Sequence, residues 1–257
     1  MSIIEAIILG LVQGLTEFIP VSSSGHLLLA HELFGTSENT LGFDVALHVG
    51  TLAALLVFFR SDIYKLARNL FAKNADGRLA RLLACATMPA LIAGLLFSDI
   101  VDEHLRSPMI VAVSLSVVAV LMLIAHRKKS DEAKEVTFRN GLLVGLAQCA
   151  ALIPGVSRSG ATITTGLFLG FAREQAARFS FLLAIPIVGG SALGLLVKDA
   201  NAFSQESTTT LLIGMLVAFS SGLLAISYML RVIARVGLKA FAYYRLVLAA
   251  VVLVVMV

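Results

Sequence analysis

Residues 17–26, with the sequence EFIPVSSSGH, interrupt an apolar run that extends from residue 3 to residue 34. Residues 154–160, with the sequence PGVSRSG, interrupt the apolar run 140–171 in the same way. Each interruption combines a proline, which ends helices, with serine and glycine, which favour turns and helix starts. We therefore expect each run to form two short helices joined by a polar elbow, called here the first elbow (17–26) and the second elbow (154–160).

The composition around the elbows indicates a membrane protein. Of the 257 residues, 58% are hydrophobic and only 14% are charged, whereas a soluble domain carries about 25% charged residues. Six further stretches are apolar and long enough to cross a bilayer as helices: 41–59, 79–97, 108–125, 176–197, 209–230 and 240–257. The sequence thus predicts an all-α polytopic membrane protein, with residues 1–257 forming a single membrane domain.

The charges of the connecting loops predict the orientation. Loops 60–81, 126–139 and 231–239 are rich in Lys and Arg, whereas loops 98–107 and 198–208 are poor in them. Basic loops stay on the cytoplasmic side. Six spans satisfy these assignments only if each broken run returns to the side from which it entered. We therefore expect two re-entrant helical hairpins, the first opening outward and the second opening to the cytoplasm, since irregular backbone at membrane depth must be buried or line a wet cavity.

The two broken runs also resemble each other. GLVQ at 10–13 matches GLAQ at 145–148, and SSSG at 22–25 matches SRSG at 157–160. Each half of the chain, 1–128 and 138–257, then consists of a hairpin followed by three spans. Because three is odd, the second half is inverted, and such inverted-topology repeats bring their broken helices together near the membrane midplane. Small-residue patches can also serve helix packing alone, but two matched patches with ionisable groups favour a shared site.

The first elbow supplies reactive groups. Gln13 and Glu17 share one helix face, and a carboxylate in an apolar run requires a cation, a metal ion or water. His26 can transfer protons or attack phosphorus near neutral pH, whereas His48, inside a span, is expected to be a core histidine. Backbone N–H groups at a helix start attract anions, and one serine there is expected to be the N-cap. The residues at this helix start are Ser22, Ser23, Ser24 and Gly25.

The second elbow supplies the positive charge. The planar guanidinium of Arg158 suits bidentate phosphate binding, and it could also form a structural ion pair with Glu17; the two roles are compatible. The polar or small residues around it are Ser157, Ser159, Gly160 and Thr162. Together the elbows predict an anion-binding cradle suited to phosphoryl transfer, in which charge stabilisation and positioning supply most of the rate enhancement.

Residues 13–26 (QGLTEFIPVSSSGH) and 154–162 (PGVSRSGAT) closely resemble the two signature motifs of the bacterial undecaprenyl-diphosphate phosphatases, the bacitracin-resistance family. The resemblance covers essentially the whole chain, including FAYYR at 241–245. It implies hydrolysis of undecaprenyl diphosphate to the monophosphate carrier used in peptidoglycan synthesis, and resistance to bacitracin. It also implies a divalent cation and a site facing the periplasm from the bacterial inner membrane. The family carries Glu or Gln at position 13, so Gln13 leaves any acid, base or strong metal-ligand role to Glu17.

These observations give a working hypothesis. Arg158 and the N–H groups near 157–160 hold phosphate oxygens, and Thr162 could donate a further hydrogen bond. Glu17, with or without Mg²⁺ or Ca²⁺, positions the attacking group. His26 or Ser23 acts as the nucleophile, or as a base toward water; the sequence leaves this open.

A rival hypothesis is a lipid-phosphate transporter or flippase, because inverted repeats with broken helices describe many transporters. For the phosphatase, the expected partners are undecaprenyl diphosphate and membrane lipid, with no nucleic acid. An oligomer is compatible with the sequence.

Overall fold

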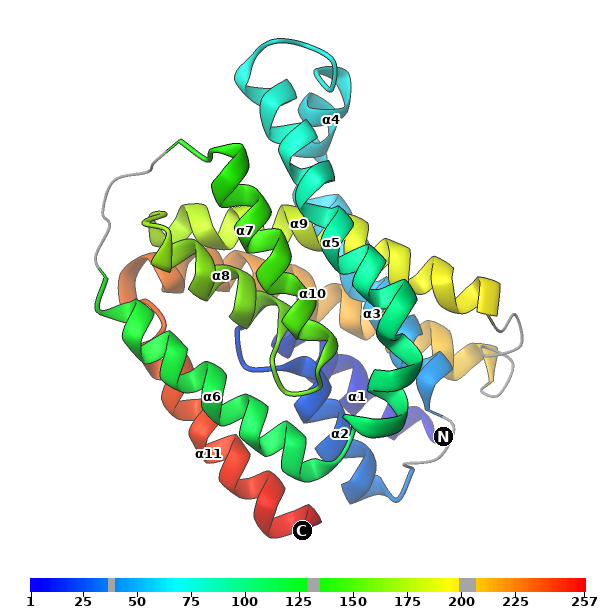
Figure 1. The fold of residues 1–257 in the computed structure, drawn as a ribbon. Coiled ribbons are helices and arrows are strands. Elements are labelled where there is room, and N and C mark those ends of the chain that lie inside the picture. The colour runs from blue at the N-terminus through cyan, green and yellow to red at the C-terminus, as the bar shows by residue number, and fades with distance from the viewer. Residues whose placement is uncertain (37–39, 129–134, 199–206) are drawn as a thin grey trace.

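The computed structural model of the chain describes residues 1–36, 40–128, 135–198 and 207–257. These residues form α-helices and one short 3₁₀ turn, without a strand, so the predicted all-α fold is confirmed (Figure 1). In chain order the elements are α1 (Ile3–Thr16), α2 (Ser23–Phe34), α3 (Leu41–Phe58), α4 (Arg60–Arg68), α5 (Ala75–His104), α6 (Pro108–His126), α7 (Phe138–Cys149), η1 (Ala150–Leu152), α8 (Arg158–Phe168), α9 (Arg173–Lys198), α10 (Thr208–Val236) and α11 (Lys239–Met256).

Six of these helices, α3, α5, α6, α9, α10 and α11, are long and apolar enough to cross a membrane. They are the six predicted spans, several of them longer than predicted, and the protein is a multi-pass membrane protein. Loop 60–81 contains a helix that the sequence did not predict, the short basic α4, which has no buried residue. In Figure 1, α4 and the start of α5 project from the rest of the molecule. Lys129, Lys134 and most of loop 198–208, which entered the charge argument, lie outside the described residues.

Both elbows begin a helix with the same local geometry. Ser22 and Ser157 are the N-caps of α2 and α8, with φ of 75° and 73°. Among the described residues they alone combine a side chain with a positive φ. Each hydroxyl accepts a hydrogen bond from the amide three residues later, Gly25 at 3.2 Å and Gly160 at 3.1 Å. The matched sequences SSSG and SRSG thus fold alike.

The two halves of the chain pack as an inverted pair. α6 lies against α11 in the opposite direction: Val111 near the start of α6 shares a core cluster with Val252 near the end of α11, and Gly237, just before α11, lies against His126 at the end of α6. α3 packs against its counterpart α9. If the two halves exchange places, α6 takes the place of α11 and α3 takes the place of α9, so each of these pairs is unchanged.

Two further contacts obey the same exchange. α1 packs on α10, and its counterpart α7 packs on α5. Both contacts are close because a glycine faces a backbone carbonyl: a Cβ on Gly10 would lie 2.8 Å from the oxygen of Gly214, and one on Gly145 would lie 2.1 Å from the oxygen of Ala86. An approximate two-fold relation between antiparallel halves follows.

The α1–α2 pair starts and finishes at one end of the helix bundle. α1 runs parallel to α10, with Gly10 beside Gly214 and Gly14 beside Ser221. α3 runs alongside α10 in the same direction, beginning with Phe43 at Gly214. α1 and α3 therefore begin at the same end, and the α1–α2 pair between them returns to its own starting end. A re-entrant hairpin requires this geometry; re-entry into the bilayer itself stays a prediction.

The three basic loops lie together at the opposite end. Arg78 donates a hydrogen bond to the carbonyl of Val136, which joins the α4–α5 region to the start of α7. Gly237, in the turn between α10 and α11, contacts His126 at the end of α6. The loops predicted to share one side of the membrane thus share one end of the molecule.

Candidate active site

The two elbows contact each other directly. The hydroxyl of Ser159 lies 3.4 Å from each of the carbonyl oxygens of Glu17 and Ile19 and donates to them. The amide of Gly155 donates to the hydroxyl of Ser24, also at 3.4 Å. Segments more than 130 residues apart in sequence therefore form one polar centre within the helix bundle.

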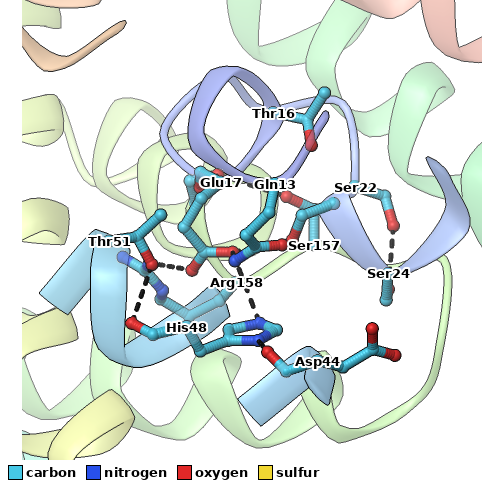
Figure 2. Close-up of polar contacts among 12 residues, drawn as sticks. Gln13, Thr16, Glu17, Ser22, Ser24, Asp44, His48, Thr51, Ser157 and Arg158 are labelled. Carbon is cyan, nitrogen blue, oxygen red and sulfur yellow. Dashed lines mark hydrogen bonds and ion pairs between the residues drawn. The ribbon is translucent and has the colours of Figure 1, made fainter. Parts of the chain in front are cut away.

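Glu17 is at the middle of this centre (Figure 2). Its side chain is buried, and Arg158 Nη2 lies 2.7 Å from its Oε1. Its Oε2 accepts hydrogen bonds from Ser23 Oγ at 2.7 Å and Gln13 Nε2 at 3.0 Å. A buried carboxylate is tolerated only when it is paired and hydrogen-bonded, and this one is both. The expected Glu17–Arg158 pair is confirmed.

Ser23 and Arg158 occupy matching positions in the two elbows, each directly after the N-cap serine. Both side chains reach Glu17, one at each carboxylate oxygen. The approximate two-fold relation therefore brings a hydroxyl from one half and a guanidinium from the other to a single acid. This asymmetry gives one anchored cation and one polarised hydroxyl at the same place.

His48 also belongs to this centre, which the sequence did not predict. Its Nε2 lies 3.6 Å from Glu17 Oε2, and its Nδ1 donates to the carbonyl of Asp44 at 2.8 Å. On the other side of the Glu17 carboxylate, the second terminal nitrogen of Arg158, Nη1, donates to the carbonyl of Ser180 in α9, which fixes the guanidinium. The sequence favoured a satisfied core histidine. His48 is hydrogen-bonded through Nδ1, as that expectation requires, but its side chain is 33% exposed and its Nε2 faces the Glu17 carboxylate, so it is not a core residue. The available signal was an ionisable side chain inside a span.

His26 is held apart from the Glu17 cluster. Its Nδ1 lies 2.7 Å from the carbonyl oxygen of Ser22, and its Nε2 lies 2.7 Å from the hydroxyl of Tyr244 in α11. The imidazole and phenol rings are stacked, with an interplanar angle of 5°. The structure thus places the two candidate nucleophiles differently: Ser23 on Glu17, and His26 on Tyr244.

The remaining predicted phosphate-binding residues shape the elbows. The hydroxyl of Ser24 lies 3.1 Å from that of Ser22, and the hydroxyl of Ser159 lies 3.2 Å from that of Ser157. Thr162 is buried, donates to the carbonyl of Arg158 at 2.8 Å and pairs with the hydroxyl of Ser180 at 2.7 Å. The amides of Gly25 and Gly160 are occupied by the caps. Phosphate contacts from these residues stay a prediction.

Arg245 in α11 connects both elbows to the bundle. It is fully buried, and its guanidinium donates to the carbonyls of Pro20 at 3.3 Å, Gly155 at 2.7 Å and Val156 at 3.1 Å. A fourth hydrogen bond, at 3.2 Å, goes to the carbonyl of Leu115 in α6. The sequence marked this arginine only as part of FAYYR, because backbone acceptors leave no pattern of side chains to detect.

The donors around Glu17 fit a weakly held, oxygen-preferring cation. Gln13 Oε1 is buried and has no hydrogen-bond partner, so one amide oxygen remains available beside the carboxylate. No group of three His, Cys, Asp or Glu side chains able to hold a metal ion occurs among the described residues. Mg²⁺ is commonly bound through one or two carboxylates together with substrate phosphates, and Ca²⁺ also takes oxygen ligands. The residues present fit that pattern.

Comparison with known proteins identifies the family of the chain. The family model of the bacitracin resistance protein BacA matches residues 6–251, which include both elbows and Arg245. The chain belongs to the BacA family. Relatives from three bacteria, all called undecaprenyl-diphosphatase, match it over nearly their full length.

The relative from Rubrobacter xylanophilus is 45% identical, with 98% of this chain and 97% of that protein covered. The relative from Saccharophagus degradans is 44% identical, with 97% of each chain covered. The relative from Teredinibacter turnerae is 43% identical, with 96% of this chain and 97% of that protein covered. The similarity to these relatives therefore extends over both halves of the chain.

Proposed function

We propose that the protein hydrolyses undecaprenyl diphosphate to undecaprenyl phosphate and inorganic phosphate. The observation that carries this proposal is the buried Glu17 carboxylate, which is held by Arg158 and Ser23 where the two elbows meet. The membership in the BacA family and the shared name of the three relatives support the same reaction. The product is the lipid carrier of peptidoglycan synthesis, and its regeneration confers resistance to bacitracin.

Binding of the substrate exchanges one anion for another on Arg158. A terminal phosphate offers the guanidinium a bidentate partner that carries more negative charge than a carboxylate. Once Arg158 turns to the phosphate, Glu17 keeps its contacts with Ser23 and Gln13 and becomes the stronger base. Arg158 then stabilises the negative charge on the transferred phosphoryl group.

The chemistry can follow two routes through these residues. In direct hydrolysis, a water oxygen bonds to the terminal phosphorus, the bond to the bridging oxygen breaks, and that oxygen leaves with undecaprenyl phosphate. The proton of the water passes to His26 or Glu17. In the covalent route, Ser23 Oγ or His26 Nε2 bonds to the terminal phosphorus while the bond to the bridging oxygen breaks and undecaprenyl phosphate leaves; the proton of Ser23, where it is the nucleophile, passes to Glu17. Water then bonds to the same phosphorus, the bond to Oγ or Nε2 breaks, and inorganic phosphate is released. Rapid quenching with terminally labelled substrate distinguishes the routes by the presence or absence of labelled protein.

We also propose a divalent cation, Mg²⁺ or Ca²⁺, held by the Glu17 carboxylate and the free amide oxygen of Gln13 together with the diphosphate. When bound, the cation would neutralise part of the substrate's negative charge. Its support is the unpaired buried oxygen of Gln13.

The proposed location is the bacterial inner membrane, with the site open to the periplasm. The support is the gathering of the basic loops at the end opposite to the start of α1, since basic loops remain cytoplasmic. The diphosphate would enter from the outer end while the prenyl tail stays in lipid. A flippase with the same inverted halves is not favoured, because the three relatives are named for phosphatase activity.

Phosphate release from undecaprenyl diphosphate by the purified protein tests the proposal. Glu17→Gln and Arg158→Ala should each lower kcat/KM by about a hundredfold or more. The matched controls are Glu32→Gln, at an exposed position of α2, and Arg178→Ala, at a partly exposed ion pair with Asp62; both should retain activity. A parent protein that releases no phosphate with a divalent cation present would refute the function, whereas release that survives both site substitutions would refute the site.

A further inference from the structure

The hydrogen bonds of His26 fix which ring nitrogen carries the proton. Nδ1 faces the carbonyl oxygen of Ser22 at 2.7 Å, and a carbonyl can only accept, so Nδ1 is the protonated nitrogen. In the neutral ring Nε2 then holds a lone pair, and it accepts a hydrogen bond from the Tyr244 hydroxyl at 2.7 Å. The one atom of His26 able to attack phosphorus or take up a proton is therefore covered by a phenol.

The position of Tyr244 is fixed by its neighbour in sequence. Arg245 is fully buried and bonds to the backbone of both elbows, at Pro20 and Gly155. This part of α11 is therefore held in place relative to the elbow that carries His26. The phenol is stacked on the imidazole, yet 48% of Tyr244 is exposed. Its hydroxyl is thus both anchored on His26 and close to the surface of the bundle.

We propose that the Tyr244 hydroxyl is a further catalytic group, which exchanges its hydrogen-bond partner when the substrate binds. In the free protein it donates to His26 Nε2; with a prenyl diphosphate bound, it donates to a phosphate oxygen and leaves Nε2 free to act. A charged phosphate oxygen is a stronger acceptor than a neutral imidazole nitrogen, so the exchange is favourable only when the substrate is present. This inference rests on the proposed function, and on His26 as the reacting base or nucleophile.

The proposal gives a reason for keeping His26 apart from Glu17. A capped Nε2 has its lone pair engaged and is held in one orientation until the diphosphate arrives. The cap also limits rotation of the ring, since loss of the phenol would leave only the Ser22 carbonyl to orient it. Tyr243, the adjacent residue, is similarly exposed and lies beneath the amine of Lys239 instead, so it provides a matched control.

The first arm of the test needs no substrate. Diethyl pyrocarbonate acylates unprotonated imidazole nitrogens, and the rate at His26 can be followed by mass spectrometry of its peptide. Tyr244→Phe keeps the ring stacking but removes the cap, so acylation of His26 should accelerate about fivefold, the effect expected from loss of one hydrogen bond. Tyr243→Phe should leave the rate at the parent value. An unchanged rate in Tyr244→Phe would overturn the inference.

The second arm measures phosphate release from undecaprenyl diphosphate by the same proteins. Tyr244→Phe should lower kcat by about tenfold or more, because the transferred phosphate loses a donor, and Tyr243→Phe should retain parent activity. Faster acylation combined with unchanged kcat would also overturn the inference, since the hydroxyl would then play no part in turnover. A parent protein without phosphatase activity would instead refute the proposed function. The acylation arm contains no substrate, so its failure would refute only the role of Tyr244.

Discussion

Glu17 and Arg158 form a buried ion pair, and such pairs rarely add stability for their own sake. Moving both charges out of water is penalised by several kcal/mol per ion, and an apolar pair of similar size is often at least as stable. The pair lies 2.7 Å apart, with Ser23 and Gln13 completing the hydrogen bonds of the carboxylate. A charge arrangement of this kind is better explained by a ligand that enters it than by the stability of the fold.

The geometry of the guanidinium, and not only its charge, should matter. Arg158→Lys keeps a positive charge but lacks the two parallel donors that the guanidinium presents to a phosphate once it turns from Glu17. We expect kcat/KM for undecaprenyl diphosphate to fall by about a hundredfold. The control is Arg178→Lys, whose parent side chain is 41% exposed and pairs with Asp62. Equal activity of Arg158→Lys and the parent protein would rule out bidentate binding.

The side chain at position 13 should determine the concentration of divalent cation that the protein needs for activity. Treatment with EDTA should abolish phosphate release, and Mg²⁺ or Ca²⁺ should restore it. Gln13→Glu places a second carboxylate beside Glu17, so half-maximal activity should require about tenfold less Mg²⁺, because oxygen-ligand sites tighten with ligand charge. The measurement is a Mg²⁺ titration of initial rates. Activity that survives EDTA in both proteins would show that Glu17 acts only as a base or as a structural group.

At the scale of single elements, each elbow depends on its capping serine. Ser157 carries a positive φ, which is costly for a residue with a Cβ, and its hydroxyl caps α8. Ser157→Ala keeps the strain and loses the cap, so it should destabilise the protein by about 1 kcal/mol, or roughly 3 °C in melting temperature. Ser157→Gly loses the cap but relieves the strain, and its melting temperature should stay closer to the parent value.

Thermal unfolding in detergent, followed by circular dichroism, measures both variants. Ser107, which caps α6 with an extended backbone, is the comparison. At Ser107 the glycine variant should not melt at a higher temperature than the alanine variant, since this backbone has no positive φ whose strain glycine could relieve. A Ser157→Gly variant less stable than Ser157→Ala would show that the positive φ carries no strain.

The elbows were predictable from the sequence because local chemistry determines them. Proline, serine and glycine within a few residues end one helix and cap the next, and the repeated SSSG and SRSG marked the two as equivalent. The Glu17–Arg158 pair followed from charge alone. His48, Tyr244 and Arg245 were not predicted as site residues, because they reach the elbows from α3 and α11 through contacts that no sequence period records. Helix α4 was missed because its charges were interpreted as a loop.

At the scale of the whole molecule, the inverted halves predict which ends face which compartment. In intact cells, a membrane-impermeant maleimide should label Glu32→Cys, at the end of α2, and Glu103→Cys, near the end of α5. Lys73→Cys, in the exposed α4–α5 loop, should react only after permeabilisation, because that loop lies at the basic end. The parent protein, with Cys85 and Cys149, gives the background. Labelling of Glu32→Cys and Lys73→Cys from the same side would contradict the predicted re-entry of α1 and α2.

Arg245 also has a mechanical consequence. Its guanidinium binds the first elbow, the second elbow and α6 at once, through backbone oxygens that carry no net charge and cannot be titrated away. If one half rocked against the other, as alternating access requires, a buried cation would lose hydrogen bonds with no water to replace them. The elbows should therefore move as one rigid body. We therefore expect the lipid to approach and leave the elbows on one side, so that each turnover ends on the face of the membrane where it began.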